Sequence, residues 1–148
     1  WNEVMETKNA NGGAGFTEYN DGTIQFETTQ WSQGYYDNGK IWQTFTLPEG
    51  KYEMRIEVKN AANIGSGSTN IHFAVAQGES LPDNEELEKS DIILSYLKFE
   101  SEHTNKTSAL PIFELTEEKT ITVGWVVSFS DICRNIEFKS VRLWSVAE

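Results

Sequence analysis

Apolar and polar side chains alternate along most of the chain from residue 23 onward. The clearest run is Tyr52, Met54, Ile56 and Val58, which alternate with charged residues. A period of two residues puts these side chains on one face of a strand and is incompatible with a helical stripe. The sequence therefore predicts a β-strand with one buried face.

A second run is apolar at both parities. It contains Ile121, Val123, Trp125, Val127 and Phe129, with Gly124 and Val126 among the residues between them. A strand with so little polar surface on its second face is predicted to be central in its sheet. Further strands are predicted over 23–28, 41–47, 70–77, 92–99, 108–115 and 136–146, about eight in all. Their spacing indicates an all-β fold, an antiparallel sandwich of the jelly-roll type.

The last predicted strand changes parity along its length. Ile136 and Phe138 share one parity, whereas Val141 and Leu143 share the other. A straight strand would turn half of these side chains to solvent. A bulge near Lys139 would bring all four to one face, so we expect one there.

Helix and loop signals are sparse. Residues 83–89 follow Pro82 and carry acidic residues early, which favours one or two short helical turns. Residues 1–22 are rich in Gly and Asn and predict an irregular segment, with one edge strand at Phe16–Tyr19. A length of 148 residues fits one domain spanning 1–148.

The long connections are predicted to gather at one end of the sandwich. Successive antiparallel strands reverse direction, so connections fall at alternate ends. One end then holds 29–40, 60–69, 100–107 and 130–135. The other holds the turns at 48–50 and 116–118 and the segment 78–91. Binding residues are commonly found on long loops carried by a rigid scaffold, so the first end is the candidate site.

Three aromatic residues in the 30–40 segment are candidates for ligand contact. Trp31, Tyr35 and Tyr36 stand among Gln, Asp and Asn. Sugars suit such a surface, because their apolar faces stack on aromatic rings and their hydroxyls hydrogen bond to the polar groups. The alternative is that these rings fold inward and plug the end of the sandwich. Trp42 has the opposite parity to its neighbour Ile41, so it is expected to face outward, or else to cover the sheet edge.

Asp131 and Arg134 lie three residues apart at the same end of the sandwich. The Arg134 guanidinium could present its planar fork to a hydroxyl pair or a carboxylate of a ligand. A local ion pair between the two side chains, fastening the turn, is the other interpretation. Both residues join the three aromatics as predicted ligand-binding residues.

Charge and composition exclude some classes of function. The net charge is −11, with 12 basic and 23 acidic residues, which opposes binding to phosphate backbones, so no nucleic-acid partner is expected. No apolar run is long enough to span a bilayer. The single cysteine excludes an internal disulfide. The sequence begins at Trp1 without a leader, so we expect a mature chain or fragment whose targeting signal has been removed.

Neither a cofactor nor a catalytic motif is indicated. His72 and His103 are far apart in the sequence, and no nucleophile elbow or phosphate loop is present. We therefore expect a non-enzyme without cofactor. A calcium ion held by carboxylates and carbonyls dispersed along the chain is the alternative that the sequence leaves open. A glycosidase fragment would require two carboxylates facing each other across a cleft.

The chain resembles a known superfamily in two places. The segment GKIWQTFTLPEGKYEMRIEV, residues 39–58, and FKSVRLW, residues 138–144, are similar to galactose-binding-like jelly rolls, and more closely to the C-terminal domain of surface lipoproteins from gut Bacteroidetes. In that superfamily the Leu-Pro-x-Gly-x-Tyr phrase forms a hairpin. The resemblance covers residues 20–146 and implies an exported, cell-surface or periplasm-facing protein that takes part in glycan capture. It supplies no catalytic residues.

Two hypotheses of function follow. The first is a non-catalytic carbohydrate-binding module whose ligand is a glycan. The second is a structural spacer that packs against neighbouring domains of a longer polypeptide and binds no small ligand. An exposed apolar patch at Trp1, Trp42 or Trp144 would favour the spacer, whereas flat exposed rings at a concave loop end would favour the glycan-binding module.

Overall fold

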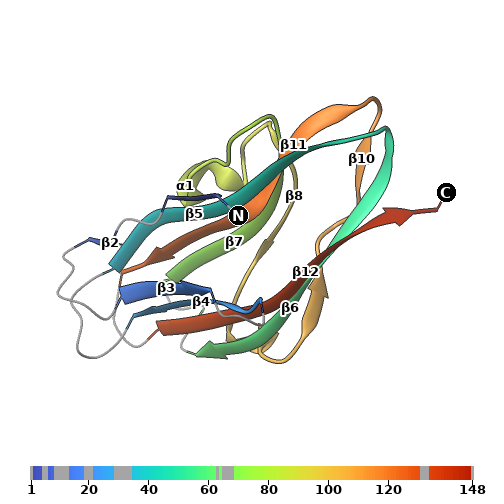
Figure 1. Cartoon of the computed structure of the whole chain (residues 1–148). Helices are drawn as coiled ribbons and strands as arrows, with labels where there is room; N and C mark the ends of the chain where they lie inside the picture. The colour runs from blue at the N-terminus through green and yellow to red at the C-terminus, as the bar shows by residue number, and fades with distance from the viewer. Residues whose placement is uncertain are drawn as a thin grey trace.

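Two antiparallel sheets pack face to face in a β-sandwich of the jelly-roll type (Figure 1). The computed structural model of the chain describes residues 2–4, 7–8, 14–18, 22–28, 35–62, 64, 69–130 and 134–147. The first sheet consists of β1 (Asn2–Val4), β2 (Thr7–Lys8), β5 (Tyr35–Leu47), β7 (Thr69–Gln77), β8 (Ile93–Lys98) and β11 (Lys119–Phe129). The second consists of β3 (Ala14–Glu18), β4 (Ile24–Thr28), β6 (Gly50–Ala62), β9 (Thr107–Ala109), β10 (Phe113–Leu115) and β12 (Arg134–Val146).

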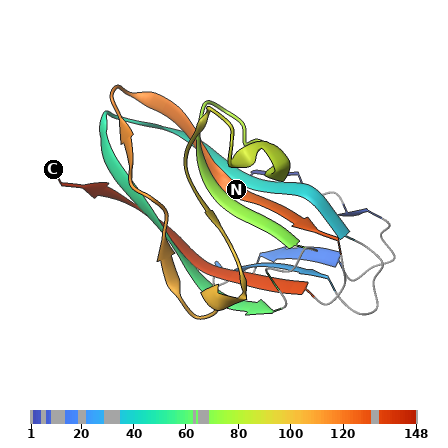
Figure 2. The same ribbon diagram turned by 180° about the vertical axis from the view of Figure 1, so that it is seen from behind.

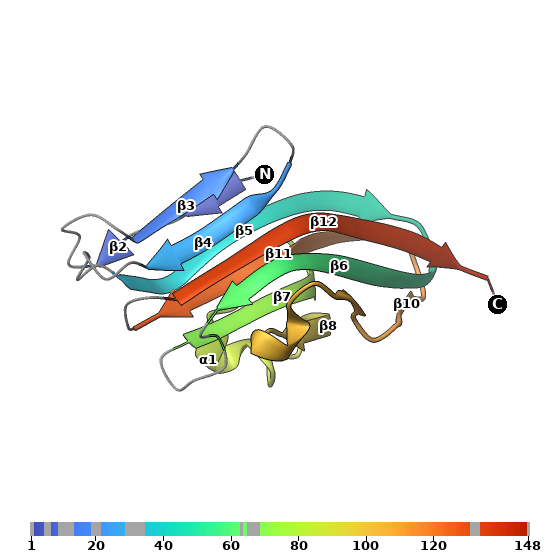
Figure 3. The same ribbon diagram turned by 90° about the horizontal axis from the view of Figure 1, so that it is seen from below.

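The two strands with the clearest alternation, β6 and β11, are each paired with neighbouring strands on both sides. β11 lies between β5 and β7, and β12 lies between β6 and β4 with β3 at the edge (Figure 3). All eight side chains predicted to be buried on β6 and β11 are in the core: Tyr52, Met54, Ile56, Val58, Ile121, Val123, Trp125 and Val127. The alternation therefore identified the inward faces of β6 and β11 correctly, and β11 is central in its sheet as predicted.

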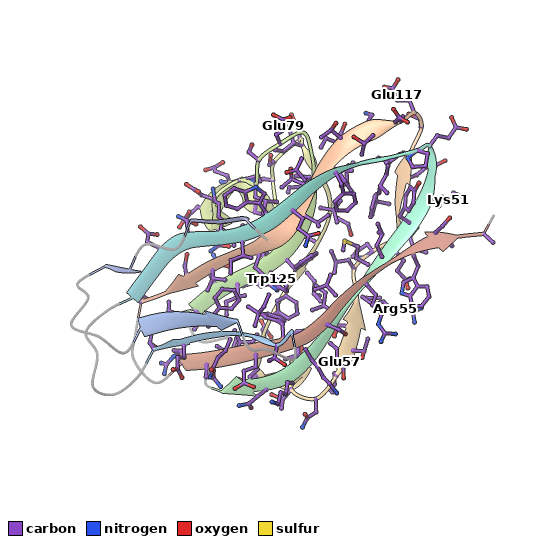
Figure 4. The ribbon with its side chains drawn as sticks, viewed as in Figure 1. Lys51, Arg55, Glu57, Glu79, Glu117 and Trp125 are labelled. Atoms are coloured by element: carbon purple, nitrogen blue, oxygen red, sulfur yellow. The ribbon has the colours of Figure 1, made fainter. Side chains whose placement is uncertain are left out.

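Trp125 lies at the centre of this core, between the two sheets (Figure 4). Its ring is 1% exposed and packs against Phe73 of its own sheet at a centroid distance of 5.0 Å. From the opposite sheet Phe138 approaches to 5.0 Å and Phe26 to 6.3 Å. Tilted and edge-on contacts of this kind add to the free energy of burying the rings.

The predicted bulge in the last strand is confirmed. Along β12 the register with β6 shifts on both sides of Phe138, so that Phe138 pairs with Val58 and Ser140 with the adjacent Glu57. Lys139 is the extra residue and is exposed. Because of this shift, Val141 and Leu143 also pack against the core.

Several boundaries differ from the sequence predictions. The predicted strand 108–115 is two short strands, β9 and β10, because Leu110–Ile112 leave the sheet while Leu110 enters the core. The interpretation of 35–40 as loop is wrong: β5 begins at Tyr35, since this part pairs with both β2 and β11. Residues 60–62 likewise belong to β6. The prediction of a single strand in residues 1–22 is wrong, because β1 and β2 also pair with β5 there. The predicted edge strand is β3, and its Tyr19 lies outside the described residues.

The segment after β7 folds back along the outer side of the first sheet. It carries one short helix, α1 (Asn84–Leu87), which lies over that sheet (Figure 2). Leu87 packs there with Leu81, Ala74, Ala76 and Val126 in a second, smaller apolar cluster. The predicted short helix is thus confirmed, but residues 81–87 do not stay at the end of the sandwich where 78–91 was placed.

Candidate ligand-binding site

A hollow of about 460 Å³ lies on the outer face of the first sheet. One wall is β5, which contributes Asp37, Asn38, Lys40 and Trp42. The other wall is the folded-back segment 79–83. The site therefore joins two parts of the chain that are distant in sequence.

Trp42 forms the apolar wall of the hollow. Its neighbour Ile41 is fully buried between the sheets, so Trp42 faces outward, as its parity predicted. The Cα partner of Trp42 on β11 is Gly124, where a Cβ atom would collide with the backbone of Ile41 and Trp42. Trp42 packs against the outer apolar cluster and remains half-buried. It does not merely cover the sheet edge, because part of its surface lines the hollow.

A bulge in β5 shapes the polar end of the hollow. Tyr36 pairs with Phe129 and Gly39 with Val127, so Asp37 and Asn38 together oppose the single residue Ser128. Asn38 has a φ of 54°, a left-handed conformation that Asn adopts more readily than most residues. Its backbone N–H donates to the Ser128 hydroxyl at 3.0 Å. This local geometry lets both side chains line the hollow.

Lys40 fastens the two walls together. Its ammonium group donates to the Leu81 carbonyl at 2.9 Å and forms an ion pair with Asp83 at 2.7 Å. The Lys40 side chain is 23% exposed and that of Asp83 55%. The folded-back segment is therefore held against β5 by a charged group at the floor of the site.

A buried polar network supports α1 beside the hollow. The Asn84 N–H donates to the Asn38 side-chain oxygen at 2.8 Å, and the Asn84 amide donates to the Asn70 carbonyl at 2.9 Å and to the Ser128 hydroxyl at 2.8 Å. With its amide nitrogen so engaged, the Asn84 oxygen accepts from His72 Nδ1 at 2.9 Å. His72 and Asn84 are both buried. The backbone N–H and the side-chain amide of Asn84 are thus fully engaged, which defines one position for the helix. Two other buried atoms of this network, His72 Nε2 and the Asn70 side-chain oxygen, have no hydrogen-bond partner among the described residues.

The hollow combines a flat ring with an excess of negative charge. Asp37, Glu79 and Asp83 line it together with a single cation, Lys40. The indole offers an apolar stacking surface, while the carboxylates and amides accept or donate hydrogen bonds. Such a site suits a neutral, hydroxyl-rich ligand and repels an anionic one.

The five predicted ligand-binding residues are placed only in part. Tyr35 and Tyr36 are the first residues of β5, directly before Asp37 at the rim of the hollow, and Arg134 is the first residue of β12. These strand starts lie at the same end of the sandwich (Figure 1). The backbone N–H of Arg134 donates to the Thr28 hydroxyl at 3.1 Å. Trp31 and Asp131 lie outside the described residues.

The hollow contains residues that sequence reasoning missed. Lys40, Glu79 and Asp83 gave no signal, because nothing in the sequence shows that 79–83 returns to β5. Within the described parts of the chain, no group of three or more His, Cys, Asp or Glu side chains is arranged to hold a metal ion. Among these same residues, no helix is long and apolar enough to cross a membrane.

The sandwich resembles solved carbohydrate-binding modules. TmCBM61, solved in complex with β-1,4-galactotriose, superposes with a TM-score of 0.52 at 10% identity, over 96% of this chain and 88% of that chain. The C-terminal CBM6 of LamC from Zobellia galactanivorans gives 0.42 at 9% identity, over 95% and 98% of the two chains. The CBM22-1–GH10 modules of Clostridium thermocellum xylanase 10B give 0.45 at 12% identity, over 99% of this chain and 29% of that one. At 10% identity, the similarity to TmCBM61 shows the fold alone.

In sequence, no curated protein matches the chain. A family profile does match, over residues 1–124, which is most of the chain. The family is described as a domain of unknown function, DUF5013. The chain belongs to the DUF5013 family.

Proposed function

We propose that this chain is a non-catalytic glycan-binding module that holds a neutral sugar against Trp42. The observation that carries the proposal is the half-buried indole, which faces a hollow lined on its other sides by carboxylates, an amide and a hydroxyl. A sugar ring can stack on the indole while its hydroxyls hydrogen bond to Asp37, Asn38 and Asp83. The resemblance of the fold to TmCBM61, which was solved in complex with β-1,4-galactotriose, supports the same function.

In this proposal the loop end extends the site beyond the hollow. Tyr35 and Tyr36 directly precede Asp37, so a longer glycan leaving the hollow along β5 would reach them. Arg134 begins β12 at this same end, and the sequence predicts that Trp31 and Asp131 lie there as well, where all three would contact further sugar units. The bound glycan would then run from Trp42 toward the aromatic residues of the 30–36 segment.

The cellular setting belongs to the proposal as well. We propose an exported protein at the cell surface or facing the periplasm, in which this domain is one module of a longer lipoprotein that captures glycans. The lipoprotein and Bacteroidetes assignment rests on the resemblance of residues 39–58 and 138–144.

The spacer hypothesis has one observation in its favour. Trp144 is 47% exposed on the outer face of the second sheet, where a neighbouring domain could cover it. The charged residues beside Trp144, Arg55 and Arg142, fit the binding of a ligand better than a contact between domains.

A glycan array with the parent protein tests the proposed function. Affinity electrophoresis in the glycans selected by the array should then show reduced binding for Asp37→Ala and Trp42→Ala. Asp37 is exposed, so its variant should melt like the parent and report on binding alone. Trp144→Ala, which removes an indole from the opposite face, is the matched control and should bind neutral glycan like the parent. Absence of binding to every neutral glycan would contradict the proposal.

A further inference from the structure

The outer face of the second sheet carries an exposed aromatic ring between two hollows. Trp144 of β12 is 47% exposed and is the only aromatic residue among the large apolar residues exposed in the described part of the chain. A hollow of about 360 Å³ lies on one side of it and a hollow of about 180 Å³ on the other. Arg55 of β6 lines both hollows. A flat ring beside two concave surfaces can receive a ring-shaped ligand.

Two arginines meet beside this ring. Arg142 of β12 is the Cα partner of Arg55, and Trp144 is the Cα partner of Glu53 one step along the same outer face. Like charges directly opposite each other on neighbouring strands destabilise a sheet. The pairing also runs against the overall composition, because the chain has a net charge of −11. An anionic ligand bound between the guanidinium groups would relieve this repulsion.

Of the two arginines, only Arg55 interacts with a carboxylate of the described residues. Glu53 accepts a hydrogen bond from Arg55 Nε at 2.6 Å, which orients that side chain. Glu57 interacts with Lys139 at 3.5 Å and with the Ser140 hydroxyl at 3.2 Å. Arg142, which is exposed, forms no ion pair with any described residue. A complete set of guanidinium donors is therefore available next to Trp144.

We propose that Trp144, Arg55 and Arg142 form a second binding site, specific for a glycan that contains uronic acid. The planar guanidinium fork matches a carboxylate with two parallel hydrogen bonds, and the indole stacks on the apolar face of the same sugar. A uronic acid residue has both features, because its carboxylate projects from the same sugar ring that stacks on Trp144.

This site is independent of the Trp42 hollow. Figure 4 shows Glu79, in the wall of that hollow, on one side of the sandwich, and Arg55 and Glu57 on the other. The two sites also differ in charge: the Trp42 hollow has three carboxylates and one ammonium, whereas the hollows beside Trp144 are lined by two guanidinium groups and two carboxylates. One domain would then hold neutral and acidic stretches of polysaccharide on its two outer faces.

The test compares binding of oligogalacturonate and of neutral galacto-oligosaccharide by calorimetry at low salt. Arg142→Gln and Trp144→Ala should each weaken oligogalacturonate binding by at least about tenfold, the effect of losing a charged hydrogen bond or a stacked ring. Arg142→Lys keeps the charge but lacks the fork, so it should also bind more weakly than the parent. Lys59→Gln removes an exposed cation from the same strand as Arg55, outside the cluster, and should bind like the parent.

The variants distinguish failure of this second site from failure of the proposed Trp42 site. Trp42→Ala should retain oligogalacturonate binding, whereas Arg142→Gln should retain binding of any neutral glycan. The inference is overturned if the parent does not bind oligogalacturonate, or if Arg142→Gln and Lys59→Gln weaken binding equally. Binding of dextran sulfate but not of oligogalacturonate would overturn the assignment to a carboxylate.

Discussion

Lys40 and Asp83 form an ion pair at 2.7 Å that joins β5 to the segment folded back over its outer face. Without this contact and the hydrogen bond from Lys40 to Leu81, the second wall of the hollow would be fastened to β5 mainly through Asn38 and Asn84. The ion pair therefore holds the two walls of the hollow together, and its two side chains also line the hollow.

Replacing Lys40 by Met should loosen that wall while keeping the length of the side chain. Both partners are partly exposed, so solvent screens the pair, and the expected loss of unfolding free energy is about 1 kcal/mol. Amide hydrogen exchange should become faster in residues 79–87. Lys59→Met removes an exposed lysine 3.7 Å from Glu137 and should leave stability unchanged within experimental error. Equal effects of the two variants would contradict the supporting role of Lys40.

Truncating Trp125 to Ala should destabilise the fold far more. Trp125 is 1% exposed and packs against aromatic residues of both sheets, so the variant loses the transfer free energy of the ring and leaves a cavity, at a cost of about 3–5 kcal/mol. Trp144→Ala is the control, since the half-exposed ring should cost less than about 1 kcal/mol. Urea unfolding of both variants measures the difference. Similar midpoints would show that Trp125 is not the centre of the core.

The loop aromatics give a prediction that separates binding from folding. If Trp31, Tyr35 and Tyr36 extend the glycan site, then among their single Ala variants at least one should lose glycan binding yet melt like the parent. Loss of one stacked ring should weaken binding about tenfold to a hundredfold, by analogy with aromatic stacking on other flat ligands. Should all three variants instead melt well below the parent, the rings plug the sandwich end and the extension of the site is wrong.

Chelation should have little effect on the fold. The sequence shows no compact cluster of metal ligands, so adding EDTA is expected to leave the melting temperature near its original value. Differential scanning fluorimetry with and without EDTA measures this. A fall of about ten degrees, which corresponds to about 3 kcal/mol for a domain of this size, would reveal a structural calcium ion.

The sheet framework was predictable from local pattern. In β6, β11 and β12 the inward side chains follow parity, and even the bulge at Phe138–Ser140 follows from the parity change between Phe138 and Val141. The outward position of Trp42 also follows from parity, because its neighbour Ile41 faces inward. These features depend on residues that are close in sequence, because burial of one strand face dictates them.

The site was less predictable because it depends on contacts between distant segments. The return of residues 79–83 to β5 depends on the contacts of Lys40 with Leu81 and Asp83. It also depends on the neighbouring Asn84, whose hydrogen-bond partners are Asn38, Asn70, Ser128 and His72. No periodicity encodes that network. The extension of β5 to Tyr35 was likewise missed, because polar and glycine residues in 37–40 obscure a strand that is held by its pairing with β11.

The most direct test of the glycan-binding claim is to follow the indole N–H signals by ¹H–¹⁵N NMR during titration with the neutral oligosaccharide selected by the array. The chain has five Trp residues, and single Trp→Phe variants assign their signals. We predict that the Trp42 signal shifts in a saturable manner and that the Trp31 signal responds to longer glycans, while the signals of Trp125 and Trp144 stay in place. A saturable titration in which the Trp42 signal does not move would contradict it.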